Sequence, residues 1–181
     1  MHLKHKTIAA IMAGCLLCYL VPAMGGDEFE GSAEERAALM EKINQERTSI
    51  EARKNELTRH ELSTKTLREQ IKQKWSKLHY YSEGNEVVRV KTYPYDGIST
   101  RTEEFYFNDG SLIFAIIQDQ GLDEGTAGET GDRKEYYYWN GQFVGERQDT
   151  VEKERSIRHS DEERLESEAA EYLEIYREHF E

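Results

Sequence analysis

The feature that most constrains the fold is a repeated pattern: an aromatic run, a turn dipeptide and an apolar run. Residues 104–113 (EFYFNDGSLI) align with residues 135–144 (EYYYWNGQFV). Asp-Gly and Asn-Gly favour type I′ turns, in which both central residues need positive φ, so each copy is predicted to be a β-hairpin. A further hairpin is expected at Asp96-Gly97. The sequence therefore predicts an α+β protein, with an antiparallel meander of about five strands across residues 86–148.

Alternation along these strands divides the side chains between two faces of the sheet. The predicted core face, under the helices, carries Val88, Val90, Phe105, Phe107, Leu112, Phe114, Ile116, Tyr136, Tyr138 and Phe143. The opposite, less buried face carries Tyr106, Tyr137 and Trp139, with Arg89 and Glu104 at its polar edge. Exposed Tyr and Trp rings can bind a protein or a glycan, so these five residues form the predicted binding site. Alternatively, a helix covers these rings, or they pack against their neighbours on the adjacent strands.

The hairpin unit resembles that of MORN-type repeats and of uncharacterised exported bacterial proteins built from such hairpins. The resemblance covers residues 104–114 and 135–145 only. It implies a binding or scaffolding module and not a catalyst. The insertion at 119–132 departs from a regular repeat array. Its acidic and glycine residues are typical of a solvated loop, and a calcium-binding loop is the alternative.

The N-terminus has the pattern of a secretory signal peptide. Lys4 and Lys6 precede an apolar run from Thr7 to Met24, which ends in small residues. Cleavage is expected after Gly25, so residues 1–25 are the predicted signal peptide of a periplasmic or secreted protein. Lipidation of Cys15, or an uncleaved membrane anchor, is the alternative. Residues 26–31 are predicted to be a flexible tether.

Helices are predicted on both sides of the sheet sequence, in segments 32–80 and 149–181. Residues 33–79 contain no Gly or Pro, and Ser32-Ala33-Glu34-Glu35 matches a capping box. A single long helix is expected here, with a kink or break near 62–66 left open. Residues 160–180 repeat apolar side chains at helical spacing and predict a C-terminal helix. The thin apolar stripe of the first helix is expected to pack within the chain. A coiled-coil homodimer through this helix is the less favoured alternative.

Charge and composition exclude several functions. The net charge of −12 repels nucleic acid, and both cysteines lie in the predicted signal peptide. The four histidines outside the predicted signal peptide show no metal-ligand spacing; they are His60, His79, His159 and His179. The sequence also contains no motif of a catalytic nucleophile. No cofactor and no metal are expected. The sequence therefore favours a non-catalytic binding or scaffolding protein of the cell envelope with a protein or glycan partner. An inhibitor or immunity-type protein of an envelope enzyme is the first alternative, and a glycan-acting hydrolase is the second.

Overall fold

The fold is given by a computed structural model that describes residues 29–63, 75–95, 101–119, 133–149 and 160–181. Two helices enclose seven strands in chain order. They are α1 (Ala33–Ala52), β1 (Thr58–Ser63), β2 (Trp75–Glu83), β3 (Glu86–Pro94), β4 (Arg101–Asn108), β5 (Ser111–Asp119), β6 (Arg133–Trp139), β7 (Gln142–Asp149) and α2 (Ser160–Phe180). The predicted signal peptide at 1–25, the Asp96-Gly97 turn and most of the 119–132 loop lie outside these residues.

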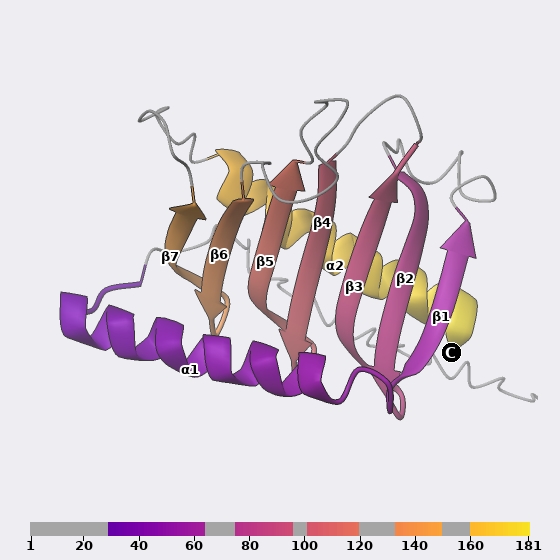
Figure 1. The fold of residues 1–181 in the computed structure, drawn as a ribbon, viewed down its shortest axis with the longest axis horizontal. Coiled ribbons are helices and arrows are strands. Elements are labelled where there is room, and N and C mark those ends of the chain that lie inside the picture. The colour runs from indigo at the N-terminus through magenta and orange to yellow at the C-terminus, as the bar shows by residue number, and fades with distance from the viewer. Residues whose placement is uncertain (1–28, 64–74, 96–100, 120–132, 150–159) are drawn as a thin grey trace, which may run out of the picture.

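All seven strands form one antiparallel sheet in the order of the chain, from β1 to β7. The helices cross this sheet on opposite faces, α1 in front and α2 behind in Figure 1. The α+β class and the antiparallel meander are thus confirmed. The prediction of about five strands is wrong, because β1 and β2 add two strands at the N-terminal side.

The long N-terminal helix of residues 33–79 is also wrong, since α1 ends at Ala52 and the chain then enters β1 and β2. The spacing of Trp75 and Leu78 suggested a continuing helix, but both residues lie in a strand, and both are buried against α2. His60 and His79, expected in a helix, lie in the strands β1 and β2. The break falls earlier than the expected kink because tertiary pairing with β3 overrides weak helical propensity.

The short turns and the helix cap were predicted more accurately than the long helical segment. Asp109 and Gly110 have φ values of 50° and 70°, and Asn140 and Gly141 have 51° and 74°, as type I′ turns require. The capping box is also confirmed. The Ser32 hydroxyl accepts from the Glu35 amide, and the Glu35 carboxylate accepts from the Ser32 amide.

Two bulges change the faces assigned to the hairpins. Tyr106 pairs with Phe114, but the next residue, Phe107, pairs with Leu112, so Ile113 is an extra residue in β5. An extra residue reverses the alternation beyond it. Phe114 and Ile116 therefore face α1, although the sequence placed them on one face with Phe105. Val88 also lies on the α1 side, because it is the unpaired extra residue at an irregularity in the β2–β3 pairing. A second shift follows Tyr137 in the β6–β7 hairpin.

The sheet consequently has a hydrophobic core on each face. On the α2 side, Leu165, Ala169, Tyr172 and Tyr176 of the helix pack on a cluster that includes Phe105, Phe107, Tyr136, Tyr138 and Phe143. On the α1 side, Ile43 and Ile50 pack on Phe114, Tyr106 and Tyr137. The apolar stripe of α1 is thus used within the chain. The tether predicted at 26–31 is fixed in part, because the Phe29 amide donates to the Phe143 carbonyl oxygen at 2.9 Å.

Candidate functional site

The five residues of the predicted binding site lie on the face of the sheet that α1 covers. Tyr106 and Tyr137 are 1% and 0% exposed, and Arg89 is 2% exposed. Glu104 is largely buried as well. Trp139 is half-buried, with Lys42 Nζ of α1 4.2 Å from the ring centroid. The expectation that these side chains form an open aromatic surface is therefore wrong, and the alternative, cover by a helix, is what the structure shows.

The structure does bring most of these residues together, as a polar network beneath α1. Arg89 lies 2.6 Å from Glu104 and 2.9 Å from Glu51 of α1, and Lys91 lies 2.7 Å from Glu104. The Tyr106 hydroxyl is 2.9 Å from a carboxylate oxygen of Glu51 and of Glu104. Burial alone would raise the pKa of Glu104, but the charges of Arg89 and Lys91 lower that pKa to about 2. This network holds α1 on the sheet.

Tyr137 makes a separate contact with α1. Its hydroxyl donates to Glu135 Oε2 at 2.9 Å and accepts a hydrogen bond from the side-chain amide of Asn44 at 3.2 Å. Burial raises the pKa of Tyr137, and the nearby Glu135 raises it further. A phenol held in this way is a neutral structural contact at physiological pH and not a surface for a ligand.

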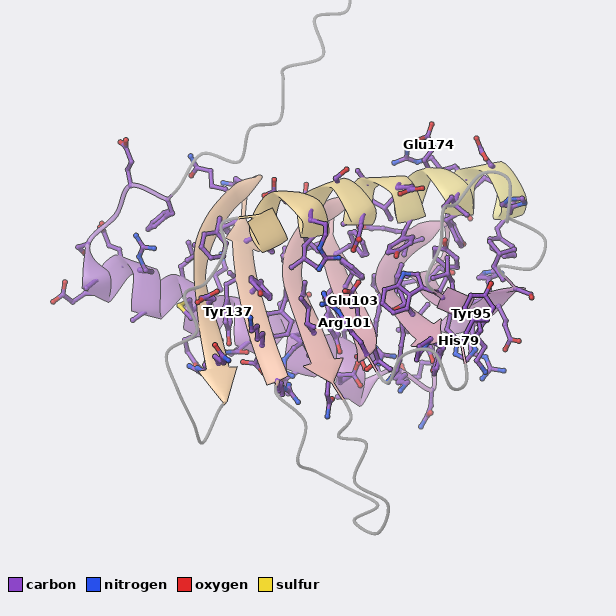
Figure 2. The ribbon with its side chains drawn as sticks, turned by 90° about the horizontal axis from the view of Figure 1, so that it is seen from above. His79, Tyr95, Arg101, Glu103, Tyr137 and Glu174 are labelled. Atoms are coloured by element: carbon purple, nitrogen blue, oxygen red, sulfur yellow. The ribbon has the colours of Figure 1, made fainter. Side chains whose placement is uncertain are left out.

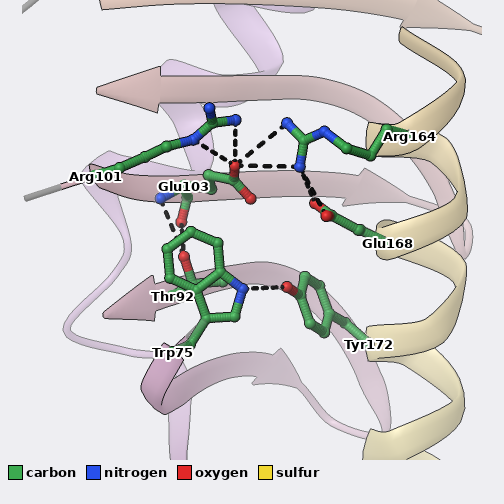
Figure 3. Close-up of polar contacts among 7 residues, drawn as sticks. All are labelled: Trp75, Thr92, Arg101, Glu103, Arg164, Glu168 and Tyr172. Atoms are coloured by element: carbon green, nitrogen blue, oxygen red, sulfur yellow. Dashed lines mark hydrogen bonds and ion pairs between the residues drawn. The ribbon is translucent and has the colours of Figure 1, made fainter. Parts of the chain in front are cut away.

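A second buried cluster lies on the opposite face, between β4 and α2 (Figure 3). The Glu103 side chain is 0% exposed, and its Oε1 accepts from Arg101 at 2.6–2.8 Å and from Arg164 at 3.4 Å. Arg164 also donates to Glu168 at 2.7 Å, and Trp75 Nε1 donates to the Tyr172 hydroxyl at 2.9 Å. Burial, followed by the neighbouring Glu103 charge, raises the pKa of Glu168 to about 7.

Two carboxylates in one cluster raise the question of acid–base catalysis. General acids and bases must reach the proton that they transfer. Glu103 cannot meet a substrate, because its side chain is fully buried. His79 is similarly enclosed, with its Nε2 2.9 Å from Glu61 and an imidazole that is 8% exposed. Both groups therefore stabilise the fold, and neither is presented to solvent.

An open concave surface lies elsewhere among the described residues, between α2 and the hairpin turns. Two adjoining hollows, of about 590 and about 310 Å³, share Gly110, Leu173 and Arg177. Together they form a groove that runs past the β2–β3, β4–β5 and β6–β7 turns. Ligand sites in proteins commonly have volumes of about 300–1,000 Å³. We call this surface the turn groove.

The turn groove has an apolar section and an acidic section. In the smaller hollow, Phe107, Leu112, Ala169, Ala170 and Leu173 supply the apolar lining. In the larger one, Glu83, Glu86, Asp109 and Glu181 surround Arg177. Glu166, Ala170, Leu173 and Arg177 recur at spacings of 4, 3 and 4 along α2, which places them on one flank of the helix. That spacing was visible in the sequence, but only the structure shows that it faces a row of turns.

The part of the chain that the structure describes contains no cluster of metal ligands and no membrane-spanning helix. None of its His, Cys, Asp and Glu side chains gather in threes around a point where a metal ion would fit. None of its helices combines the length and the apolar character needed to cross a bilayer. Comparison of the chain with protein-family models, with curated proteins and with solved structures found no match.

Proposed function

We propose that this chain is a non-catalytic module that binds another protein through the turn groove. The observation that carries the proposal is the arrangement of the two helices. Since α1 and α2 cover opposite faces of the sheet (Figure 2), the aromatic rings of both faces are used as core. The groove is a concave, partly apolar surface that the two helices leave open.

The lining favours a protein partner over a glycan. Glycan sites would use exposed aromatic rings, but Phe107 and Tyr176 in the groove are 1% and 4% exposed. What the groove presents is aliphatic side chains and glycine turns with a charged rim. A cleft of that kind suits a segment of polypeptide, whose apolar side chains need burial and whose backbone needs hydrogen-bond partners. An inhibitor of an envelope enzyme would be one form of this activity.

Site-specific crosslinking tests the proposal. A benzophenone amino acid replaces Ala170, which is exposed in the groove lining, and irradiation follows in cells of the native host. The matched control carries it at Glu174, which points from α2 away from the sheet (Figure 2). We expect one discrete protein adduct at Ala170, absent at Glu174 and lost when Arg177→Glu is added. Equal labelling from both positions would reject the groove as the binding surface.

A further inference from the structure

The shape and charge of the turn groove restrict what can occupy it. We infer that the occupant is an extended, cationic segment of a partner protein, with an apolar side chain in the Leu112–Leu173 section and a Lys or Arg at the β2–β3 end. The inference rests on the proposed function and adds the chemistry of the partner. Four observations support it, on length, on apolar contact, on charge and on the position of Arg177.

The length of the segment that fills the groove follows from the geometry of its two walls, the row of hairpin turns and α2. The three hairpin turns lie two strands apart from one another, so their row spans about 19 Å at ~4.8 Å per strand. On the helix side, Glu166 and Arg177 are separated by about 17 Å at ~1.5 Å per residue. An extended chain advances ~3.4 Å per residue, so about five or six residues fill this length.

Apolar contact is available at the middle of the groove. Leu112 is half-buried, Leu173 is 9% exposed and Ala170 is exposed, although all three border the fully buried core around Phe107. A large apolar side chain placed here would remove the remaining apolar surface from water, at about 25 cal/mol per Å². The groove therefore selects an apolar residue at this point of the segment.

Charge distinguishes the neighbouring section. Glu83 is paired with Arg53 of the α1 end, at 2.6 Å. Among the described residues, Glu86, Asp109 and Glu181 have no ion-pair partner, yet they surround the same hollow. The three carboxylates outnumber the one Arg177 guanidinium that lines the hollow with them, so this section has a net negative charge and favours a cation. Residues two apart on an extended chain face the same side, about 7 Å from each other. A Lys or Arg two residues from the apolar residue would reach them.

Arg177 lies where the two sections meet, since it lines both hollows. Its guanidinium stays charged in proteins and carries five N–H donors and no acceptor. An extended segment presents carbonyl oxygens at regular intervals, so Arg177 can donate to the backbone of the occupant without opposing its cationic side chain. The groove then binds one apolar and one cationic side chain of the partner segment, and Arg177 donates to the segment's backbone between them.

The test is a titration with defined peptides, followed by NMR. The probe is an acetylated hexapeptide amide, Ser-Leu-Ser-Lys-Ser-Gly, and a second probe reverses Leu and Lys because the chain direction is open. Two controls replace Lys by Glu, or Leu by Ser. The amide signals of Gly84, Gly110 and Gly141 are the reporters, one from each turn of the groove.

We expect one of the two probes to shift the Gly110 and Gly84 signals, with each control binding at least about tenfold more weakly. In the protein, Glu86→Gln with Asp109→Asn should weaken that probe at least about fivefold, while Glu174→Gln leaves it unchanged. Asparagine retains the positive φ of the turn, so the variant keeps its fold. Equal binding of the Glu peptide, or no shift with either probe at millimolar concentration, overturns the inference.

The two proposals can fail separately. If the Ala170 crosslink identifies a partner whose contacting segment carries no cation, the binding function stands and the inferred chemistry is wrong. If the probes bind at the turn glycines but the crosslink gives no adduct, the groove has the inferred chemistry and the protein-binding function is wrong.

Discussion

Two neighbouring carboxylates on β4 show how single residues fasten the two helices. Side chains alternate along a strand, so Glu103 faces α2 and Glu104 faces α1. Glu104 is surrounded by cations and is held ionised, whereas Glu103 lies close to a second carboxylate, that of Glu168. Adjacent residues of one type therefore stabilise different helices and confer different pH dependence.

The first prediction concerns the network under α1. Arg89→Met removes the cation that Glu104 and Glu51 share, so it leaves a buried carboxylate with less compensation. Breaking a buried pair in this way costs about 3–5 kcal/mol. The free energy of unfolding in urea should fall by that amount. The control, Arg53→Met, breaks a pair with the exposed carboxylate of Glu83 and should cost less than about 1 kcal/mol. Equal losses would show that the Arg89 network is not a special anchor.

The second prediction concerns the pH dependence that Glu168 adds. Its pKa is raised to about 7 in the folded protein from the ordinary value of 4.5, so the folded state favours the protonated acid. The stabilising contribution is full below pH 4.5 and is lost as the pH rises through 7. His79 has a pKa lowered from 6.5, chiefly by burial, and acts in the opposite direction, since its contribution is full above pH 6.5 and is lost as the pH falls through the lowered pKa of the folded state.

A comparison with Glu168→Gln separates the two groups, because His79 is present in both proteins. Glutamine resembles the protonated acid. The variant should gain stability relative to the parent by on the order of 2 kcal/mol between pH 5 and pH 8, measured by urea unfolding at each pH. A difference that is constant over this range would show that Glu168 does not titrate there.

At the scale of elements, the sequence predicted what short-range rules determine. The Asp109-Gly110 and Asn140-Gly141 turns and the Ser32 cap depend on local backbone chemistry, and all three are present. The end of α1 could not be predicted in this way, because β1 is stabilised by pairing with β2, and β2 by pairing with β3, which comes more than 30 residues after α1 in the sequence. The binding residues were misplaced for the same reason: alternation gives two faces but does not say which one a helix covers.

The third prediction tests the bulge that reversed these faces. Phe114 lies under α1, with its ring centroid 4.9 Å from that of Tyr137, whereas Phe105 lies 5.3 Å from Tyr172 of α2. Each change to alanine should cost about 3–5 kcal/mol. Hydrogen exchange should then separate the two. Phe114→Ala should accelerate exchange in residues 33–52, and Phe105→Ala in residues 164–180. Faster exchange in α2 after Phe114→Ala would mean that the face assignment is inverted.

At the scale of the whole molecule, a helix covers each face of the sheet, and the proposed binding surface lies at the end where the hairpin turns are. The same plan explains why the aromatic runs of β4 and β6 are needed for folding. Both runs alternate between two cores, and so each strand contributes rings to both. The groove is built from what remains, the turn ends and one flank of α2.

The fourth prediction is export, which follows from the basic and apolar pattern of residues 1–25. Intact-mass analysis of protein from the cell envelope of its host should find a chain that begins at Gly26. A chain that retains Met1, or that carries lipid on Cys15, would contradict cleavage at this site. A mass that starts after Ala23 would move the site by two residues and preserve the export.

The central claim is that the turn groove, and not the aromatic face under α1, binds the partner. Calorimetric titration of the partner identified through the Ala170 crosslink tests it most directly, with Ala170→Trp and Trp139→Ala compared with the parent. The account predicts that Ala170→Trp, which fills the groove from an exposed position, weakens binding by about 2 kcal/mol or more without lowering the melting temperature. Trp139→Ala should leave the affinity unchanged. Loss of affinity in Trp139→Ala, with full binding by Ala170→Trp, would contradict the account.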